Sequence, residues 1–259
     1  MTDGRALARQ YLEQQRLLGG NSVILEGARS REQGAAPAPA TAPSSENSPA
    51  PRSLLPPPGL SFDPPSSDLF AADPIQQTRT LADVAALIAP CIRCKLCEGR
   101  TRTVPGEGPA DARLIVVGEG PGKTEDATGR PFVGRAGELL TKILGAIALP
   151  REQVYICNVV KCRPPDNRLP QYDEIAACVP YLYRQIELVK PKAILAMGGT
   201  AAQTLLNTKQ SLGALRNQVH RFRGIPLIVT YHPAALLRNP NWKRPTWDDV
   251  RIVRRLLDR

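Results

Sequence analysis

Six cysteines lie close together in the sequence, between positions 91 and 178 of a 259-residue chain. Cys91 and Cys94 are separated by two residues, a spacing that lets both sulfurs turn toward one metal centre. Cys162 and Cys178 form no matching pair, because they are sixteen positions apart and fall in different predicted elements. This asymmetry favours a 4Fe-4S cluster held by these four thiolates over a zinc ribbon, with zinc as the alternative metal.

Two further cysteines leave the ligand set open. Cys97 can replace one of the ligands, and the purpose of Cys157 stays open. We expect the thiols to be reduced rather than paired, because Met1 to Gly4 lack the layout of a secretory signal. The compartment predicted from this is the cytoplasm. The alternative use of the thiols is ordinary burial in a core.

Polar residues and glycines follow several apolar segments of the chain. The GEGPG motif at 118–122 comes directly after one apolar run, and its glycines allow the backbone to approach a ligand closely. Asn158 lies in a second run, where its amide is either a structural bridge or a reader of a ligand. His232 follows a third run, whereas His220 lies in a predicted hairpin and is assigned a structural role.

The apolar pattern predicts an α/β domain that positions these residues. Short β-branched runs predict strands, and apolar residues at three- and four-residue spacing predict helices. Their alternation implies a three-layer sandwich, with a short, mostly parallel central sheet flanked by helices and ligands at the carboxyl ends of the strands. The expected strands are 114–117, 154–160, 193–197, 219–222 and 226–231; the expected helices are 133–147, 175–189, one capped by Thr200, and a last one opening with Thr246-Trp247-Asp248-Asp249.

The positive charge belongs to the C-terminal part of the chain. Residues 1–85 hold seven basic and nine acidic residues, whereas residues 86–259 hold 27 and 15. Such a basic domain favours a polyanionic partner, because each Lys or Arg near a phosphate releases counterions, although a generically basic surface is the alternative. No run approaches the roughly 20 apolar residues of a membrane span, so we expect no membrane contact. The composition also excludes a collagen, a coiled coil and a fully disordered chain.

Two parts are therefore expected, an N-terminal arm at 1–85 and a folded, monomeric domain at 86–259. Ten prolines within residues 35–65 predict a semi-stiff linker without a core, and we expect the arm to be disordered. A short segment at 6–18 predicts a marginal helix, which either docks on a protein partner or frays.

Several motifs in order resemble those of family 4 uracil-DNA glycosylases, the iron–sulfur branch of that superfamily. The resemblance runs from about residue 91 to residue 259 and leaves residues 1–85 outside. It implies a DNA repair enzyme that hydrolyses the N-glycosidic bond of uracil in DNA, releasing free uracil and leaving an abasic site. It rests on the Cys91/Cys94 pair, GEGPG at 118–122, GRPFVG at 129–134, Asn158 with KCRPP at 161–165, and HPA at 232–234 followed by Leu237-Arg238.

The resemblance also implies roles for single residues. Phe132 would stack on the flipped base, Asn158 would read its edge, and His232 would donate to the O2 atom that gains charge. The best-known relatives position the attacking water with an Asp, but Gly120 occupies that slot here. Glu119 and Asn167 are therefore the candidates for that role.

Further residues complete the expected site. Pro121 would line the pocket with Glu119 and Gly120, and Glu125 would either face the methyl group of thymine or bond to the loop backbone. Ordinary solvated loop positions are the alternative for these polar groups. The expected DNA contacts are Arg163, Arg168, Leu236, Leu237 and Arg238, with helix packing as the alternative for each leucine.

Two other functions stay open. A non-enzymatic, metal-containing DNA-binding module would share the charge and the cysteines, but would not need Phe132, Asn158 and His232 at strand ends. A relative that traps uracil-DNA covalently uses a histidine in a basic insertion, and residues 161–168 contain neither. The cluster is expected to be structural, since Cys162 and Cys178 flank the loop that carries Asn167.

Overall fold

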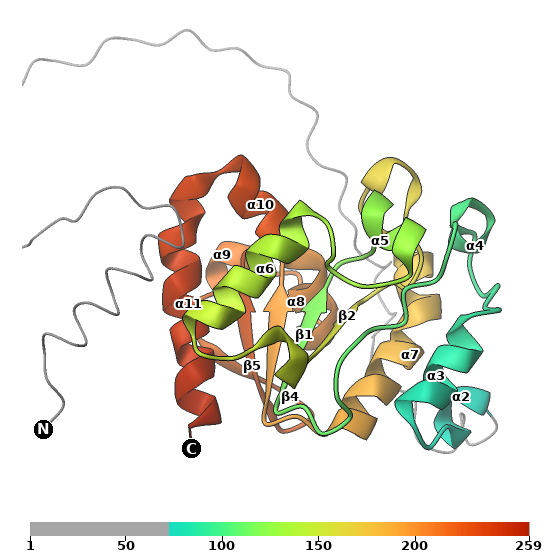
Figure 1. The fold of residues 1–259 in the computed structure, drawn as a ribbon, viewed down its shortest axis with the longest axis horizontal. Coiled ribbons are helices and arrows are strands. Elements are labelled where there is room, and N and C mark those ends of the chain that lie inside the picture. The colour runs from blue at the N-terminus through green and yellow to red at the C-terminus, as the bar shows by residue number, and fades with distance from the viewer. Residues whose placement is uncertain (1–72, 259) are drawn as a thin grey trace, which may run out of the picture. The chain divides into compact units, whose positions relative to one another are not determined.

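The computed structural model describes residues 73–258, whose architecture is drawn in Figure 1. Five strands form one sheet in the order β2-β1-β3-β5-β4, in which only β4 runs antiparallel to its neighbour. The predicted α/β class with a mostly parallel central sheet is confirmed. The strands are β1 (Leu114–Gly118), β2 (Val154–Asn158), β3 (Ala193–Met197), β4 (Val219–Phe222) and β5 (Ile225–Thr230).

Helices flank this sheet. The α-helices are α2 (Pro74–Gln77), α3 (Leu81–Ile88), α4 (Leu96–Gly99), α5 (Lys123–Thr128), α6 (Arg135–Ala146), α7 (Tyr172–Val189), α8 (Gly199–Leu206), α9 (Leu212–Leu215), α10 (Pro233–Arg238) and α11 (Lys243–Leu257). Three 3-10 helices, η1 (Arg151–Gln153), η2 (Pro165–Asn167) and η3 (Pro240–Trp242), complete the described elements. None of the described helices is both long and apolar enough to cross a bilayer.

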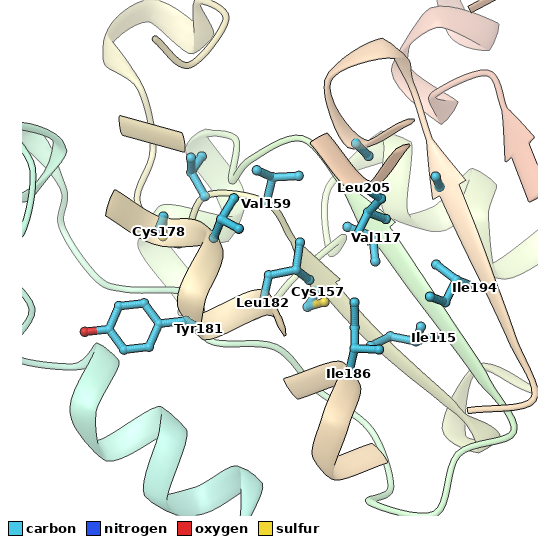
Figure 2. Packing of buried hydrophobic residues seen from close by; sticks show 14 of the residues in the cluster. Ile115, Val117, Cys157, Val159, Cys178, Tyr181, Leu182, Ile186, Ile194 and Leu205 are labelled. Atoms are coloured by element: carbon cyan, nitrogen blue, oxygen red, sulfur yellow. The ribbon is translucent and has the colours of Figure 1, made fainter. Parts of the chain in front are cut away.

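The core follows from the register of the strands. Ile115 of β1 pairs with Tyr155 and Ile194, so alternate residues of neighbouring strands share one face of the sheet. That face packs against α7 and α8, and Figure 2 shows its residues opposite Leu182 and Ile186 of α7. The central strands are buried along their whole length, as expected for parallel strands covered on both sides. The carboxyl ends of β1, β2, β3 and β5 therefore meet at one edge of a rigid sheet.

Two predicted helix starts differ from the structure. The last helix begins at Lys243, so Thr246 and Asp249 lie inside it and are buried. Asp249, which was expected in an acidic first turn, instead accepts hydrogen bonds from Arg216 and Thr230. Gly198, not Thr200, is the N-cap residue of α8, and no side chain caps that helix.

The predicted boundary at residue 85 crosses packed structure. Ile75 of α2 and Val84 of α3 are fully buried, and both helices contact α7. Arg184 of α7 also donates from Nε to the Thr78 hydroxyl at 3.2 Å. Residues 73–85 therefore pack as the rest of the described domain does. The predicted helix at 6–18 and the proline-rich linker lie outside the described residues.

Candidate functional site

A cavity of about 440 Å³ opens at the carboxyl edge of the sheet. The residue after β1, the last residue of β2, the residue after β3 and a residue shortly after β5 all reach it, as the topology requires. All the predicted catalytic and substrate-binding residues lie in its wall. The lining consists of Glu119, Gly120, Pro121, Gly122, Glu125, Phe132, Ala136, Asn158, Pro164, Asn167, Arg168, Leu169, Gly198, His232, Ala234 and Arg238.

Asn158 presents an unpaired polar atom to this cavity. Its side chain is 1% exposed, and its Oδ1 atom has no hydrogen-bond partner in the described structure. Buried polar atoms are normally paired, so an acceptor without a protein donor in a cavity wall is available to a hydrogen-bond donor of a ligand or a water. The strand register places Gly118 directly beside Asn158. A Cβ atom at position 118 would lie 2.4 Å from Oδ1, so glycine is required there.

Phe132 forms a second wall and has a constrained backbone. Its φ is 51°, a left-handed conformation that is uncommon for a bulky residue. The guanidinium of Arg151 donates to the Phe132 carbonyl at 2.9 Å and holds this turn. A Cβ atom at Gly137 would lie 1.8 Å from the same carbonyl, so only glycine lets α6 approach. The turn places the Phe132 ring 5.4 Å from the His232 ring.

His232 is held as a neutral imidazole. Burial, together with the nearby Arg238 charge, lowers the pKa of His232 to about 4. Its Nδ1 atom accepts a hydrogen bond from the backbone N–H of Ala234 at 3.2 Å, where His232 caps α10. The single ring proton of the neutral form is therefore on Nε2. His232 can donate one hydrogen bond to a ligand in the cavity without carrying a charge.

Glu119 is positioned by a residue that the sequence suggested only as a helix cap. The hydroxyl of Thr200 donates to Glu119 Oε2 at 2.6 Å. Burial raises the pKa of Glu119, whereas the Thr200 bond and the charge of Arg238 lower it. No local pattern reveals this contact, because 81 positions separate the two residues.

Glu125 braces the loops around the cavity. Its Oε1 atom accepts hydrogen bonds from the backbone N–H groups of Val133 and Gly134, both at 2.9 Å. Its Oε2 atom accepts from the Gly122 N–H at 3.2 Å. Of the two roles expected for Glu125, bonding to the loop backbone is the one that these contacts show.

The loop after β2 is tied together by two arginines. Arg163 Nε donates to Asn167 Oδ1 at 2.8 Å, which engages the acceptor of that amide. The guanidinium of Arg168 forms two hydrogen bonds, at 2.6 and 2.8 Å, to the fully buried carboxylate of Glu174. Arg168 therefore braces the base of the loop, and its expected phosphate contact would compete with this ion pair.

The two leucines after the histidine differ in position. Leu236 is 1% exposed and packs inside the protein, so it is not placed to enter DNA as the sequence suggested. Leu237 is 41% exposed, and the adjacent Arg238 lines the cavity. Leu169, 53% exposed, also lines the cavity. Sequence reasoning missed Leu169, because an isolated leucine in a polar loop carries no periodic signal.

The four predicted metal ligands line a second, smaller cavity. Cys91, Cys94, Cys162 and Cys178 surround it, together with the basic residues Arg93, Arg100 and Lys161. Cys157 packs instead in the sheet core, and Cys97, a residue of α4, does not reach the cavity.

The donors around this cavity suit a negatively charged group. Arg100 donates to Cys162 Sγ and the Lys161 amide donates to Cys178 Sγ, both at 3.2 Å. Burial raises the pKa of the Cys178 thiol to about 12, so it becomes a thiolate only when a metal centre binds it. Asp73 pairs with Arg93 at 3.5 Å, and no described carboxylate in the cavity lining supplies negative charge for Arg100 and Lys161. Four thiolates with an iron–sulfur core would supply that negative charge.

Among residues 73–258, no three Cys, His, Asp or Glu side chains form a group that could hold a metal ion.

Comparisons with known proteins agree with this geometry. Residues 105–252 match the family model described as the uracil DNA glycosylase superfamily. The type-4 uracil-DNA glycosylase of Thermotoga maritima is 49% identical over 60% of this chain and 82% of its own length. The type-4 enzyme of Sulfurisphaera tokodaii is 44% identical over 68% and 84%. A type-5 uracil-DNA glycosylase of Pyrobaculum aerophilum is 32% identical over 60% and 74%. The chain therefore belongs to the uracil-DNA glycosylase superfamily, within its type-4 group.

Proposed function

We propose that the protein hydrolyses the N-glycosidic bond of uracil in DNA, releasing uracil and leaving an abasic site for repair. The observation that carries this proposal is the unpaired, buried Oδ1 atom of Asn158 in the cavity wall. It lies in the same cavity as an aromatic ring and a neutral histidine. Family membership supports the same activity.

Asn158 accounts for the choice of base. The Oδ1 atom accepts a hydrogen bond from uracil N3–H, while the amide NH₂ donates to uracil O4. Cytosine presents an acceptor and a donor in the reverse order, so both contacts become unfavourable. Because the base must leave the DNA stack to reach this cavity, Phe132 provides the surface on which it stacks.

His232 favours cleavage of the bond. As the glycosidic bond breaks, negative charge accumulates on uracil O2 and the sugar becomes oxocarbenium-like. The Nε2–H group of neutral His232 donates to O2, and this interaction strengthens as the charge develops. A neutral donor also adds no positive charge of its own beside the developing cation on the sugar.

Glu119 is our choice for the group that positions the attacking water. Thr200 holds its carboxylate through a hydrogen bond. The best-known relatives use an aspartate for this role, but Gly120 occupies that position here. The other candidate, Asn167, has its acceptor oxygen engaged by Arg163. Glu119 can accept a proton of the water that attacks C1′ of the sugar, opposite the departing uracil.

The activity is tested with a single-stranded oligonucleotide that contains one uracil, incubated with pure protein and then treated with alkali. We expect strand scission at the uracil position and none in matched strands containing cytosine or thymine. The Asn158→Asp variant is expected to lose activity on uracil. Intact strands from folded, metal-loaded protein would refute the proposal, and an adduct that survives denaturation would indicate the covalent relative instead.

We also propose that Cys91, Cys94, Cys162 and Cys178 hold a 4Fe-4S cluster. When bound, this group supplies a cross-link between the segment before β1, the loop after β2 and α7, because hydrolysis itself needs no electron transfer. Purified protein should be brown and absorb broadly in the visible range. The Cys162→Ala variant should lose the colour and bind DNA more weakly. A colourless protein with stoichiometric zinc, or a stable variant with full DNA affinity, would contradict this proposal.

A further inference from the structure

An exposed aromatic stack next to the cavity has no part in the chemistry described above. The Trp242 ring of η3 lies parallel to the Tyr231 ring, with centroids 4.7 Å apart and planes at 4°. Tyr231 directly precedes His232, so the stack begins one residue from the base-binding wall. Trp242 is 37% exposed, so part of its ring faces solvent.

The stack is built on a buried anchor. The guanidinium of Arg216 lies 4.3 Å from the centroid of the Tyr231 ring. Because Trp242 covers one face of Tyr231, Arg216 must cover the other. Arg216 Nε donates to Asp249 at 2.8 Å, and the fully buried Asp249 also accepts from the Thr230 hydroxyl at 2.7 Å. These contacts fix Arg216, Tyr231 and Trp242 as three successive layers before any ligand arrives.

The surroundings of Trp242 favour a negatively charged partner. The segment from Leu237 to Arg244 contains three basic residues and no acidic residue. Arg238 and Arg244 are exposed, and α10, which carries the cavity residue Arg238, contacts η3. An exposed aromatic ring within basic side chains is the arrangement that binds single-stranded nucleic acid.

We propose that Trp242 is a stacking platform for an unpaired nucleobase of the DNA strand, next to the nucleotide that enters the cavity. The inference rests on the proposed function only in taking DNA as the ligand. The ring of the nucleobase extends the existing layers, while the basic side chains contact the adjacent phosphates. The platform would hold the strand while the neighbouring uracil turns out of the stack.

Binding of uracil-free single strands tests the platform separately from excision. Fluorescence anisotropy should show that Trp242→Ala raises the Kd by roughly 10-fold, within the range of one lost base–aromatic stack. Trp242→Phe keeps a ring and should retain most of the affinity. Val219→Ala is the matched control, since Val219 is an apolar residue, 51% exposed, on the edge strand β4. This control should leave the Kd unchanged.

A scan with abasic spacers distinguishes stacking from a general effect on the fold. A spacer is moved along the strand one position at a time, and the Kd of wild type and Trp242→Ala is compared at each. The difference should disappear at one spacer position, where no base remains to stack. An equal difference at every position, or none on intact strands, would overturn the platform. Failure of the wild type to bind any strand would refute the proposed function as well.

The chain contains two tryptophans, which provides a direct readout. Trp247 is 6% exposed, so stacking by DNA can reach only Trp242. Titration of the full-length protein with uracil-free strands should quench the tryptophan emission, and the Trp242→Phe variant should show no quenching. Quenching that persists in this variant would assign the signal to Trp247 and contradict the inference.

Discussion

Replacement of Lys161 by Met should destabilise the protein and weaken catalysis together. Lys161 is 1% exposed and lines the cysteine cavity. Its ammonium group donates to the Asn158 carbonyl at 2.7 Å and to Gln185 Oε1 at 2.6 Å. Its amide donates to Cys178, so this one residue links the strand that carries Asn158 to the expected cluster. Met keeps the length of the side chain and removes both ammonium contacts.

The size of the effect follows from those two contacts. A hydrogen bond to a charged group contributes about 1.5 to 3 kcal/mol, so two contribute about 3 kcal/mol at the lower limit. The lower limit applies because Met also removes the desolvation of a buried ammonium group. In a domain of this size, about 3 kcal/mol corresponds to a decrease in Tm of roughly 6 to 12 °C. Release of the Asn158 backbone should lower kcat/KM for uracil excision by about tenfold or more.

The measurements are urea unfolding, thermal unfolding and excision kinetics on cluster-loaded protein under exclusion of oxygen. Lys142→Met is the matched control, since Lys142 is exposed on α6. The control should leave both stability and kcat/KM unchanged. If Lys161→Met keeps the wild-type Tm, the two contacts do not hold the strand end and the reasoning fails. A lower Tm with full kcat/KM would separate stability from base reading.

Three further predictions address the cavity itself. His232 has a pKa of about 4, below its usual value of about 6.5, so the unfolded chain is protonated first as the pH falls. The stability that this shift provides is present above pH 6.5 and is lost as the pH falls toward 4. Urea unfolding should therefore show that the free energy of unfolding of the wild type falls by about 3 kcal/mol more than that of His232→Asn across this window. An equal loss in both proteins would contradict the shift. Thr200→Val removes a bond that lowers the pKa of Glu119, so the acid limb of kcat/KM should move to higher pH. A limb that does not move would belong to another group. Gly118→Ala places a Cβ atom 2.4 Å from Asn158 Oδ1 and should reduce kcat/KM for uracil excision by about tenfold or more. An unchanged kcat/KM in this variant would show that the two strand ends can separate to make room.

The sequence predicted the parts of the site that depend on local pattern. Apolar runs identified the strands, and the residues that follow them are near one another because parallel strands end at the same edge. Asn158 and His232 could therefore be assigned to one cavity from the order of strands and helices alone.

The contacts that position these residues could not be predicted in this way. Thr200 meets Glu119 across 81 positions, and Asp249 meets Arg216 across 33. In both cases a polar residue near a helix start resembles a cap, and tertiary packing provides a different partner. Leu236 and Leu237 are indistinguishable by type, and only the orientation of α10 makes one buried and the other exposed.

The pairing of β1 with β2 has a consequence for how base preference can change. Gly118 and Asn158 are opposite each other in a buried parallel ladder, so the amide that we propose reads the base is held by the sheet and not by a loop. A shift of either strand by one residue would turn that amide to the opposite face. Base preference should therefore evolve through substitutions at these two strand ends. Variation in the loops would alter how DNA is held, while the identity of the excised base stays the same.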